Sequence, residues 1–477
     1  MPTISLVAGV KHMFDKTTQI EGNSLSTPTV TFLGHAGFDF RHQGVRLIVD
    51  PWLVGNAFDS GWELLLPAPA FDPVGITHIW FSHEHPDHFS PPTLKLIPPE
   101  VRANVTVIVQ QCEDRRLAEF MRTQGYGSVL EVQDGAVVSL SNEHEEQVGI
   151  IVTVACGIGD SCHLLELGGI RMLNTNDCAF DSAAGFASVL TKLGADRAPI
   201  DLLISQFSYA NWVGNPDEGL LRKNLAEHKL ELLDRQVEVA KPRHVFPCAS
   251  FIVFAHEENH YLNDHINDVG KVCARLSSGG TTPILMSSGE TYPLNREGFA
   301  AMANQVPVVA NLIAAEIDRV RNGSRTPLKN QGVPLVELRQ VAQDSLARLC
   351  AGVSRLDFLL MKRQLPRAIF ELRDHQLLFV VDRLCHISIV PIDSLPADVL
   401  LSSSALLYAF KNDFGFETLL INGRFEKRRD KGDVTILKLT GQFGYLRRKE
   451  SLTRSILERK VRKPLLRLAR RRRVLGE

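Results

Sequence analysis

Residues 76–89, ITHIWFSHEHPDHF, decide how this 477-residue chain is interpreted. Their first half is an almost continuous apolar run, which is typical of a strand in a sheet covered on both faces. Their second half places His83, His85, Asp87 and His88 directly after that strand. The stretch therefore predicts a buried strand that runs straight into a polar, chemically active loop.

The side chains of this loop are of the kinds that bind metal ions. Imidazole and carboxylate suit zinc, iron or manganese. Residues two apart on a loop that leaves a strand point the same way, so His83 and His85 can hold one metal while Asp87 and His88 reach a second. The alternative is a chance cluster on a polar loop, but three histidines in six positions are a rare grouping among 16 in the whole chain.

The sequence on either side alternates between strand and helix patterns, with strands in the majority. β-Branched and aromatic runs such as TVTFLG at 29–34 and VTVIVQ at 105–110 predict strands. Leucines at helical spacing predict a long amphipathic helix at 217–240. This order predicts the α/β class.

The pattern turns helical after about residue 295, and alternation then resumes in a smaller α+β domain. Serines open a predicted helix at 402–412. Phe414, Phe416 and Leu419 in FGFETLLINGRFE predict a strand that covers the substrate cleft, or an ordinary core strand. The predicted divisions are an N-terminal extension at 1–26, a metal-binding domain at 27–295, a helical connector at 296–335, the small domain at 336–440 and a basic tail at 441–477.

Composition limits the classes of protein that this chain can belong to. At 44% hydrophobic residues, the chain can build two or more cores, which excludes global disorder. A net charge of -1 gives no overall attraction to nucleic acid, and no nucleic-acid partner is expected. The first residues do not form the apolar core of a signal peptide, so a cytoplasmic location is expected, with the eight cysteines reduced.

The neutral total hides a basic C-terminus. From Arg447 to Arg473 there are thirteen basic and two acidic residues, a local charge of +11. The tail is expected to contact the protein's own acidic surface or to stay solvated. A partner protein, an anionic membrane or nucleic acid are the alternatives.

Three motifs together resemble the metallo-β-lactamase superfamily: GHAGFDF at 34–40, VDPWL at 49–53 and FSHEHPDHF at 81–89. The resemblance implies an αββα sandwich with a metal site at one edge of its two sheets. It also implies that Asp177, in NTNDC, is the aspartate that bridges two metals, against the alternative of a turn residue. Asp87 and Asp177 are then the carboxylates on which catalysis depends.

Two other ligand positions of the superfamily are altered in this chain. The loop ACGIGDSCHLLEL offers Asp160 or His163 where a histidine is usual. FPCASF offers no histidine after its proline, so His256 in HEENH, or else His244, is expected to replace it. HEENH also matches a zinc-protease motif, but no amphipathic helix surrounds it, so a separate site is not predicted.

His35 and Asp50 are expected just outside the metal ligands. A carboxylate there orients a metal-bound imidazole and fixes its tautomer. For Asp50 the alternative is a simple turn residue before Pro51.

Further segments are similar to the CMP-N-acetylneuraminate hydroxylase family and its bacterial relatives. They are NTNDC, FSYANW at 207–212, KPRHVFPCASF at 241–251, HEENHYLND at 256–264 and KNDFGFETLLINGRFE at 411–426. Vertebrate members carry a Rieske iron–sulfur domain before this region. Here the first cysteine is Cys112, so the resemblance implies that electrons come from a separate electron-transfer protein.

These features favour a metal-dependent oxygenase with two iron ions that acts on a small organic substrate. A site with more carboxylates and fewer histidines suits iron, which can bind dioxygen. The first alternative is a two-metal hydrolase, with zinc or manganese, that cleaves a phosphoester, a lactone or a related bond. The second is a non-catalytic metal-binding protein.

Overall fold

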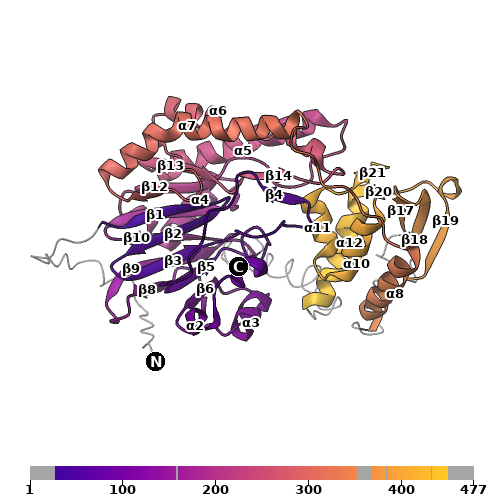
Figure 1. Ribbon diagram of the computed structural model, residues 1–477, viewed down its shortest axis with the longest axis horizontal. Helices are drawn as coiled ribbons and strands as arrows, with labels where there is room; N and C mark the ends of the chain where they lie inside the picture. Colours follow the sequence, from indigo (N-terminus) through magenta and orange to yellow (C-terminus); the bar gives the residue numbers. More distant parts are fainter. Residues whose placement is uncertain (1–26, 157–158, 352–366, 383–384, 431, 449–477) are drawn as a thin grey trace, which may run out of the picture.

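The computed structural model describes residues 27–156, 159–351, 367–382, 385–430 and 432–448 (Figure 1). Two seven-stranded sheets form its larger part. In spatial order, the first contains β16 (Thr291–Pro293), β1 (Thr29–Gly34), β2 (Gly37–His42), β3 (Val45–Val49), β5 (His78–Phe81), β6 (Thr106–Gln110) and β7 (Ser128–Val132). The second contains β15 (Thr282–Pro283), β13 (His244–Cys248), β12 (Leu202–Gln206), β11 (Ile170–Asn176), β10 (Ser161–Leu167), β9 (Gln147–Ala155) and β8 (Val137–Ser141).

Helices cover the outer face of each sheet. The first sheet carries α1 (Pro91–Leu94), α2 (Pro99–Arg102) and α3 (Arg116–Thr123). The second carries α4 (Ala183–Leu193), the short η1 (Ala195–Arg197), α5 (Gly219–Ala240), α6 (Val269–Ser278) and α7 (Arg296–Arg321). In Figure 1, α5 to α7 lie along one side of the sheets and α2 and α3 along the other. The predicted αββα sandwich is confirmed, and α5 matches the predicted helix at 217–240.

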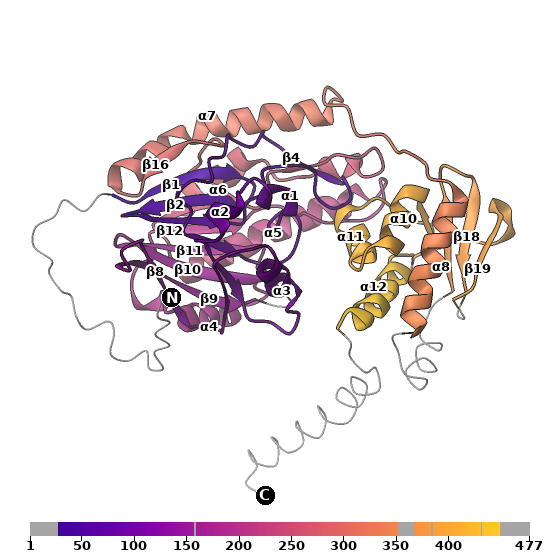
Figure 2. The same ribbon diagram turned by 60° about the horizontal axis from the view of Figure 1, so that its bottom comes forward.

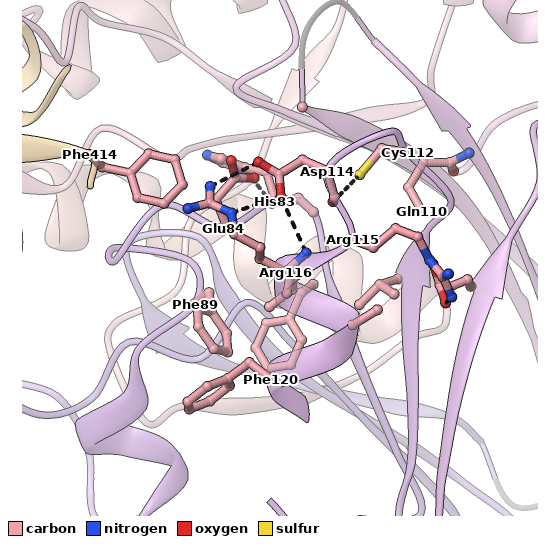
Figure 3. A pocket seen from close by; sticks show the side chains of 17 residues that line it. His83, Glu84, Phe89, Gln110, Cys112, Asp114, Arg115, Arg116, Phe120 and Phe414 are labelled. Atoms are coloured by element: carbon pink, nitrogen blue, oxygen red, sulfur yellow. Dashed lines mark hydrogen bonds and ion pairs between the residues drawn. The ribbon is translucent and has the colours of Figure 1, made fainter. Parts of the chain in front are cut away.

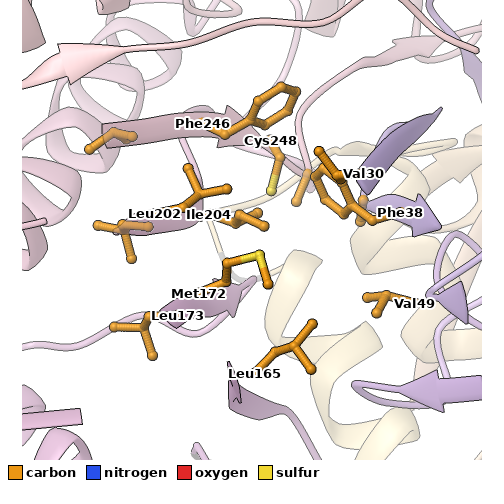
Figure 4. Close-up of a cluster of buried hydrophobic side chains, with 14 of the residues drawn as sticks. Val30, Phe38, Val49, Leu165, Met172, Leu173, Leu202, Ile204, Phe246 and Cys248 are labelled. Atoms are coloured by element: carbon orange, nitrogen blue, oxygen red, sulfur yellow. The ribbon is translucent and has the colours of Figure 1, made fainter. Parts of the chain in front are cut away.

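The main core fills the space between the two sheets (Figure 4) and continues beneath the helices on the outer face of the second sheet. Side chains alternate between the two faces of a strand, so each sheet contributes every second residue to this layer. Phe38 of β2 meets Phe246 of β13 with ring centroids 5.4 Å apart. Such packing holds the two sheets in one fixed relation, which the site at their edge requires.

The segment predicted as a helical connector, 296–335, is helical over most of its length and packs on the larger domain. Its helix, α7, packs against α6 and buries Phe299, Met302 and Ile313 in the main core. Among the described helices, α7 alone has the length and composition to cross a membrane, but a buried core helix passes the same test. Only residues 322–334 link the two domains.

The C-terminal domain has its own sheet and its own core. Its sheet has five strands, in the order β19 (Ile387–Pro391), β18 (Leu377–Val381), β17 (Ala368–Leu372), β20 (Val399–Leu401) and β21 (Glu426–Lys427). Its helices are α8 (Leu335–Ala351), η3 (Ile392–Ser394), α10 (Ser403–Lys411), α11 (Gly415–Asn422) and α12 (Gly432–Arg448). Figure 2 shows this domain beside the sandwich.

Two expectations for this domain have different outcomes. The serine cap is confirmed, since Ser402 Oγ accepts a hydrogen bond from the N–H of Ala405 at the start of α10. The strand predicted around Phe416 and Leu419 is wrong, because these residues lie on α11 and bury one helical face. Gly423, with φ +69°, ends that helix in the left-handed conformation that favours glycine. The basic tail beyond residue 448 lies outside the described residues.

The two domains meet at a small two-stranded sheet of β4 (Trp62–Leu64) and β14 (Ile252–Phe254), next to the short helix η2 (His260–Asn263). Asn422 Nδ2 donates to Phe58 O at 3.0 Å, and the N–H of Trp212 donates to Leu420 O at 2.9 Å. Arg424, from the C-terminal domain, pairs with Asp59. Phe58 is part of this interface, and its ring also contacts His85 in the loop after β5.

Candidate metal centre

The histidine loop is a tight turn between β5 and α1. The N–H groups of His88 and Phe89 both donate to the carbonyl of His85, at 3.0 and 2.7 Å. Ser90 then caps α1 by accepting a hydrogen bond from the N–H of Thr93. Since backbone bonds hold the turn at both ends, its imidazole and carboxylate groups converge with little freedom.

His83, His85 and Asp160 form one group of potential ligands. His83 Nε2 lies 2.9 Å from His85 Nδ1 and 3.8 Å from Asp160 Oδ1. His83 is buried and the other two are partly exposed. The group therefore has a closed side toward the core and an open side toward solvent.

Asp87, His88 and Asp177 form the second group. His88 Nε2 lies 3.3 Å from Asp87 Oδ2 and 3.5 Å from Asp177 Oδ2. Ligand atoms of His83, His88 and Asp177 all lie within 4.8 Å of one another, so Asp177 borders both groups. The structure thus brings together all five residues that the motifs predicted, with Asp160 as a sixth.

The charges of this centre favour a cation. Burial alone would lower the pKa of His88, but Asp87, Asp177 and Asp50 hold that pKa well above its usual value. Burial, with the charge of Asp177, raises the pKa of Asp160 to about 7. His88 Nε2 and Asp87 Oδ1 are buried and hydrogen-bond to no described residue. Metal ions fit such a site, because they satisfy buried ligand atoms and displace bound protons.

Asp50 orients His88, as predicted. Its carboxylate lies 3.0 Å from His88 Nδ1 and accepts hydrogen bonds from Ser82 N, Ser82 Oγ and Asn176 Nδ2. An Nδ1–H group that donates to Asp50 leaves the Nε2 lone pair facing the centre. Asp50 is fully buried between the two sheets and is thus more than a turn residue.

His35 acts on the other side of the centre. Its Nε2 lies 3.1 Å from Asp87 Oδ2, and its carbonyl accepts a hydrogen bond from the N–H of Ala249. His35 therefore positions Asp87 and ties the turn at 34–37 to the end of β13. Ligand atoms of His35, Asp87 and His88 also lie within 4.8 Å of one another, so the place of His35 outside the ligands stays a prediction.

Three predicted ligands lie elsewhere. His163 points between the sheets and packs its ring 4.3 Å from that of Trp80, where burial lowers its pKa to about 3. His244 stacks on Phe299 at 4.2 Å, at the start of β13, while the metal centre lies beyond the end of that strand. Among the described residues, neither histidine belongs to a group that could hold a metal ion.

His256 is the third correction. Its Nδ1 lies 3.4 Å from Glu258 Oε2, and its backbone pairs with Leu328. It is thus part of the interface between the domains rather than of the metal centre. The position after Pro247 holds Cys248, whose pKa is held well above its usual value by burial and, to a smaller extent, by the charge of Asp177.

Gln206 and Lys229 both lie at the centre, although no motif in the sequence marks them. Gln206 Nε2 donates to Asp177 Oδ1 at 3.2 Å, and Lys229 Nζ donates to Gln206 Oε1. Lys229 stands on α5 as one of many charged residues, so nothing in its local pattern separates it from a solvated lysine. Burial lowers its pKa, and Asp177 and Asp160 oppose that effect.

A cavity of about 200 Å³ lies behind His83 and Glu84 (Figure 3). Phe89, Phe120 and Phe414 line its apolar part. Phe414 comes from the C-terminal domain, and the Arg116 guanidinium lies 4.0 Å from the centre of its ring. The C-terminal domain therefore helps to close a cavity beside the metal centre, although with a loop residue before α11 instead of a strand.

Asp160 and His163 can be separated by experiment. Replacing Asp160 with asparagine should lower metal occupancy, because a neutral amide is a poorer ligand than a carboxylate. Replacing His163 with phenylalanine should leave occupancy unchanged, since His163 packs against Trp80. Metal content measured by mass spectrometry on both purified variants checks this. Full occupancy in Asp160→Asn would exclude Asp160 as a ligand.

Comparisons with known proteins agree with this geometry. Residues 29–181 match the family model described as a beta-lactamase superfamily domain. The chain is 26% identical over 256 residues to the cytidine monophosphate-N-acetylneuraminic acid hydroxylase of Xenopus laevis, covering 49% of this chain and 40% of that protein. The mouse hydroxylase is also 26% identical, over 49% of this chain and 41% of its own length.

Two solved structures are similar to part of this chain. CmlA, a diiron β-hydroxylase from Streptomyces venezuelae, is 19% identical with a TM-score of 0.41, over 56% of this chain and 54% of that one. Igni18, a metallo hydrolase from Ignicoccus hospitalis, is 13% identical with a TM-score of 0.38, over 57% of this chain and 99% of that one.

The alignments cover less than half the length of the two hydroxylases. Their match to about half of this chain supports the second, narrower resemblance as well as the first. Residues 29–181 thus match a beta-lactamase superfamily domain, and about half of the chain is similar to the CMP-N-acetylneuraminic acid hydroxylases at 26% identity.

Proposed function

We propose that this protein is an oxygenase that uses two iron ions to hydroxylate a small organic substrate. The donor set carries the proposal. Three imidazoles, of His83, His85 and His88, meet three carboxylates, of Asp87, Asp160 and Asp177. Sites with a high share of carboxylate suit iron.

The first group resembles a ligand set known for dioxygen chemistry. Two histidines and one carboxylate, here His83, His85 and Asp160, are typical of non-haem iron that keeps open positions. Iron so held supplies the binding and reduction of dioxygen. Asp177 lies next to both groups and is suited to bridge two metals. The similarity to the hydroxylases supports this interpretation.

Reduction of dioxygen requires electrons from outside the metal centre. We propose that a separate electron-transfer protein in the cytoplasm supplies them. The open side of the centre, at His85 and Asp160, is where dioxygen and substrate would reach the metals. The aromatic cavity behind His83 would accommodate an apolar part of the substrate.

Lys229 gives a prediction about the charge of the ligand. Its ammonium group lies near Asp177 and Asp160, and we propose that it binds an anionic group. Replacing Lys229 with methionine should weaken binding of inorganic phosphate to the metal-loaded protein by about 10- to 100-fold, the range for a hydrogen bond to a charged group. Calorimetric titration measures this. Lys223→Met, at an exposed position of the same helix, is the matched control. Equal affinity in both variants would reject the role.

Metal analysis tests the oxygenase directly. Protein expressed with iron should contain about two iron ions per chain, absorb in the near ultraviolet and consume dioxygen when a reductant is supplied. Zinc-loaded protein should neither absorb in the near ultraviolet nor consume dioxygen. Stoichiometric zinc in the purified protein, together with phosphodiesterase turnover, would overturn the oxygenase proposal.

A hydrolase remains the second candidate. It is favoured by the motif HxHxDH on a β-lactamase superfamily domain, since two metals can generate hydroxide near neutral pH and polarise a phosphoryl or carbonyl oxygen. The same metal analysis distinguishes it from the oxygenase. A non-catalytic role would leave both dioxygen consumption and ester hydrolysis at background.

A further inference from the structure

Three cysteines that are separate in the sequence meet in one place. Cys156 follows β9, Cys162 lies on β10 and Cys178 follows β11. Their sulfur atoms all lie within 4.8 Å of one another, and those of Cys156 and Cys162 are 3.1 Å apart. The three strands are neighbours in the second sheet, so the fold itself brings these thiols together.

This thiol cluster lies on the opposite face of β10 from the sandwich interior. Ser161 Oγ donates to Ser82 O, and His163 packs against Trp80, so both point toward the first sheet. Cys162 lies between them and therefore points the other way. The cluster is thus distinct from the metal centre, although Asp160 and Asp177 are close to it in sequence.

The three side chains are enclosed. Cys162 is fully buried, while Cys178 and Cys156 are 3% and 9% exposed. All three belong to the main hydrophobic core, where an ordinary cysteine behaves as a small apolar residue. Cysteines that serve only as apolar packing residues can each face a separate hydrocarbon neighbour. These three sulfur atoms instead face one another.

A disulfide is a poorer account of this geometry. Cys162 pairs with Val154, and Cys156 is two residues further along, which makes the two cysteines a diagonal pair. Diagonal residues have Cα atoms about 7–8 Å apart. A disulfide needs about 4.4–6.8 Å. Bonding one pair would also leave the third sulfur without a role.

We propose that Cys156, Cys162 and Cys178 bind one thiophilic metal ion, of the zinc or monovalent copper class. Two sulfurs on one zinc ion, each at about 2.3 Å, can be at most ~4.6 Å apart, which is close to the 4.8 Å within which these three sulfurs lie. Soft thiolates favour ions of this class, and a site of three thiolates is chemically distinct from the imidazole and carboxylate groups of the metal centre. Each thiol that binds the ion releases its proton, so no oxidant or reductant is needed.

Such an ion would fasten the loops that carry two metal ligands. The N–H of Cys156 donates to Asp160 O at 2.8 Å, and Cys178 directly follows Asp177. A bound ion would therefore fix the ends of β9, β10 and β11 relative to one another. The site is proposed on geometry independent of the oxygenase, and it would remain if that function proved wrong.

Cadmium provides a selective probe, because sulfur–cadmium bonds absorb in the ultraviolet and oxygen or nitrogen ligands do not. Reduced, metal-free full-length protein titrated with cadmium should develop this charge-transfer band at one ion per chain. Asp87→Asn, which weakens the metal centre, should retain the band. Cys162→Ser and Cys178→Ser should each weaken the band and lower cadmium affinity by more than ~10-fold.

Two further variants serve as controls. Cys273→Ser changes a buried cysteine of α6 outside the cluster and should keep the band. Cys248→Ser tests a sulfur close to Asp177 and His88 of the metal centre and should also keep the band. X-ray absorption on zinc-loaded wild-type protein should find zinc–sulfur distances of about 2.3 Å. This measurement does not depend on any variant folding. No band in the wild type, loss of the band in Cys248→Ser alone, or a mapped Cys156–Cys162 disulfide would overturn the proposal.

Discussion

Replacing Asp177 with alanine should abolish activity and remove most of the bound metal. Its carboxylate lies 3.5 Å from His88 Nε2 and borders both groups of ligands, so its loss affects both metal positions. Changes to residues that only orient ligands reduce metal affinity or activity by about 10- to 100-fold. Loss of a carboxylate that borders both groups should exceed that range. Metal content and dioxygen consumption measure the effect.

The fold should survive this substitution, since Asp177 lies on a loop at the edge of the sheets. The circular dichroism spectrum and the urea unfolding curve of Asp177→Ala should therefore match those of metal-free wild-type protein. Asp181→Ala, an exposed aspartate four residues later, is the matched control and should keep its metal. The metal content of Asp50→Asn should lie between those of Asp177→Ala and Asp181→Ala, because Asp50 acts through His88. Normal metal content in Asp177→Ala would reject the two-group site.

The histidine loop could be predicted because all its ligands belong to one turn. HEHPDH carries its own geometry: the turn is closed by backbone hydrogen bonds to His85, and the strand before it is recognisable from its apolar run. The role of Asp177, just after β11 of the second sheet, was implied instead by the resemblance to the metallo-β-lactamase superfamily. Local patterns thus predicted the residues whose position is set locally.

The choice between Asp160 and His163 could not be made this way. Alternation along a strand decides which residues point inward, but the sequence does not mark the residue at which β10 begins. The strand begins at Ser161, so Asp160 stays in the loop and His163 turns toward Trp80. If β10 began one or two residues further along the chain, the sequence pattern would favour His163 over Asp160 as the loop residue near the metal centre.

Sequence patterns also did not predict the contacts between distant segments of the chain. His256 matched a ligand motif, but its neighbour Glu258 pairs with Arg424, which lies 166 residues further along the chain. The helix α11 was mistaken for a strand because a short apolar run fits both periods. Both errors concern positions whose environment is set by the other domain.

The interface between the domains depends on one buried arginine. Arg424 donates to Glu258 Oε2 at 3.0 Å and to Asp59 Oδ2 at 2.6 Å. Its side chain is 4% exposed and that of Glu258 is 2% exposed. Asp59 follows Phe58, whose ring lies 5.6 Å from that of His85. The pairing of Arg424 therefore also supports one wall of the metal centre.

Replacing Arg424 with methionine should lower the free energy of unfolding by about 3–5 kcal/mol, the range for removing one partner of a buried ion pair. Arg428→Met is the matched control, since Arg428 pairs with Glu371 at an exposed position and should lose at most ~1 kcal/mol. Urea unfolding of both variants at neutral pH measures the difference. Equal stability in the two variants would show that the interface does not depend on Arg424.

The effect of Arg424→Met should also depend on pH, and the sign follows from the carboxyl groups left behind. Burial raises the pKa of Asp59 to about 6 and raises that of Glu258, while Arg424 opposes both shifts. Without the arginine, both pKa values should rise further above those of the unfolded chain. The folded variant then binds protons that the unfolded chain has released, so its instability grows as the pH rises through about 4 to 7. Unfolding at pH 5 should show a smaller loss than at pH 8, whereas a loss that does not change with pH would mean that packing, rather than uncompensated charge, accounts for the effect.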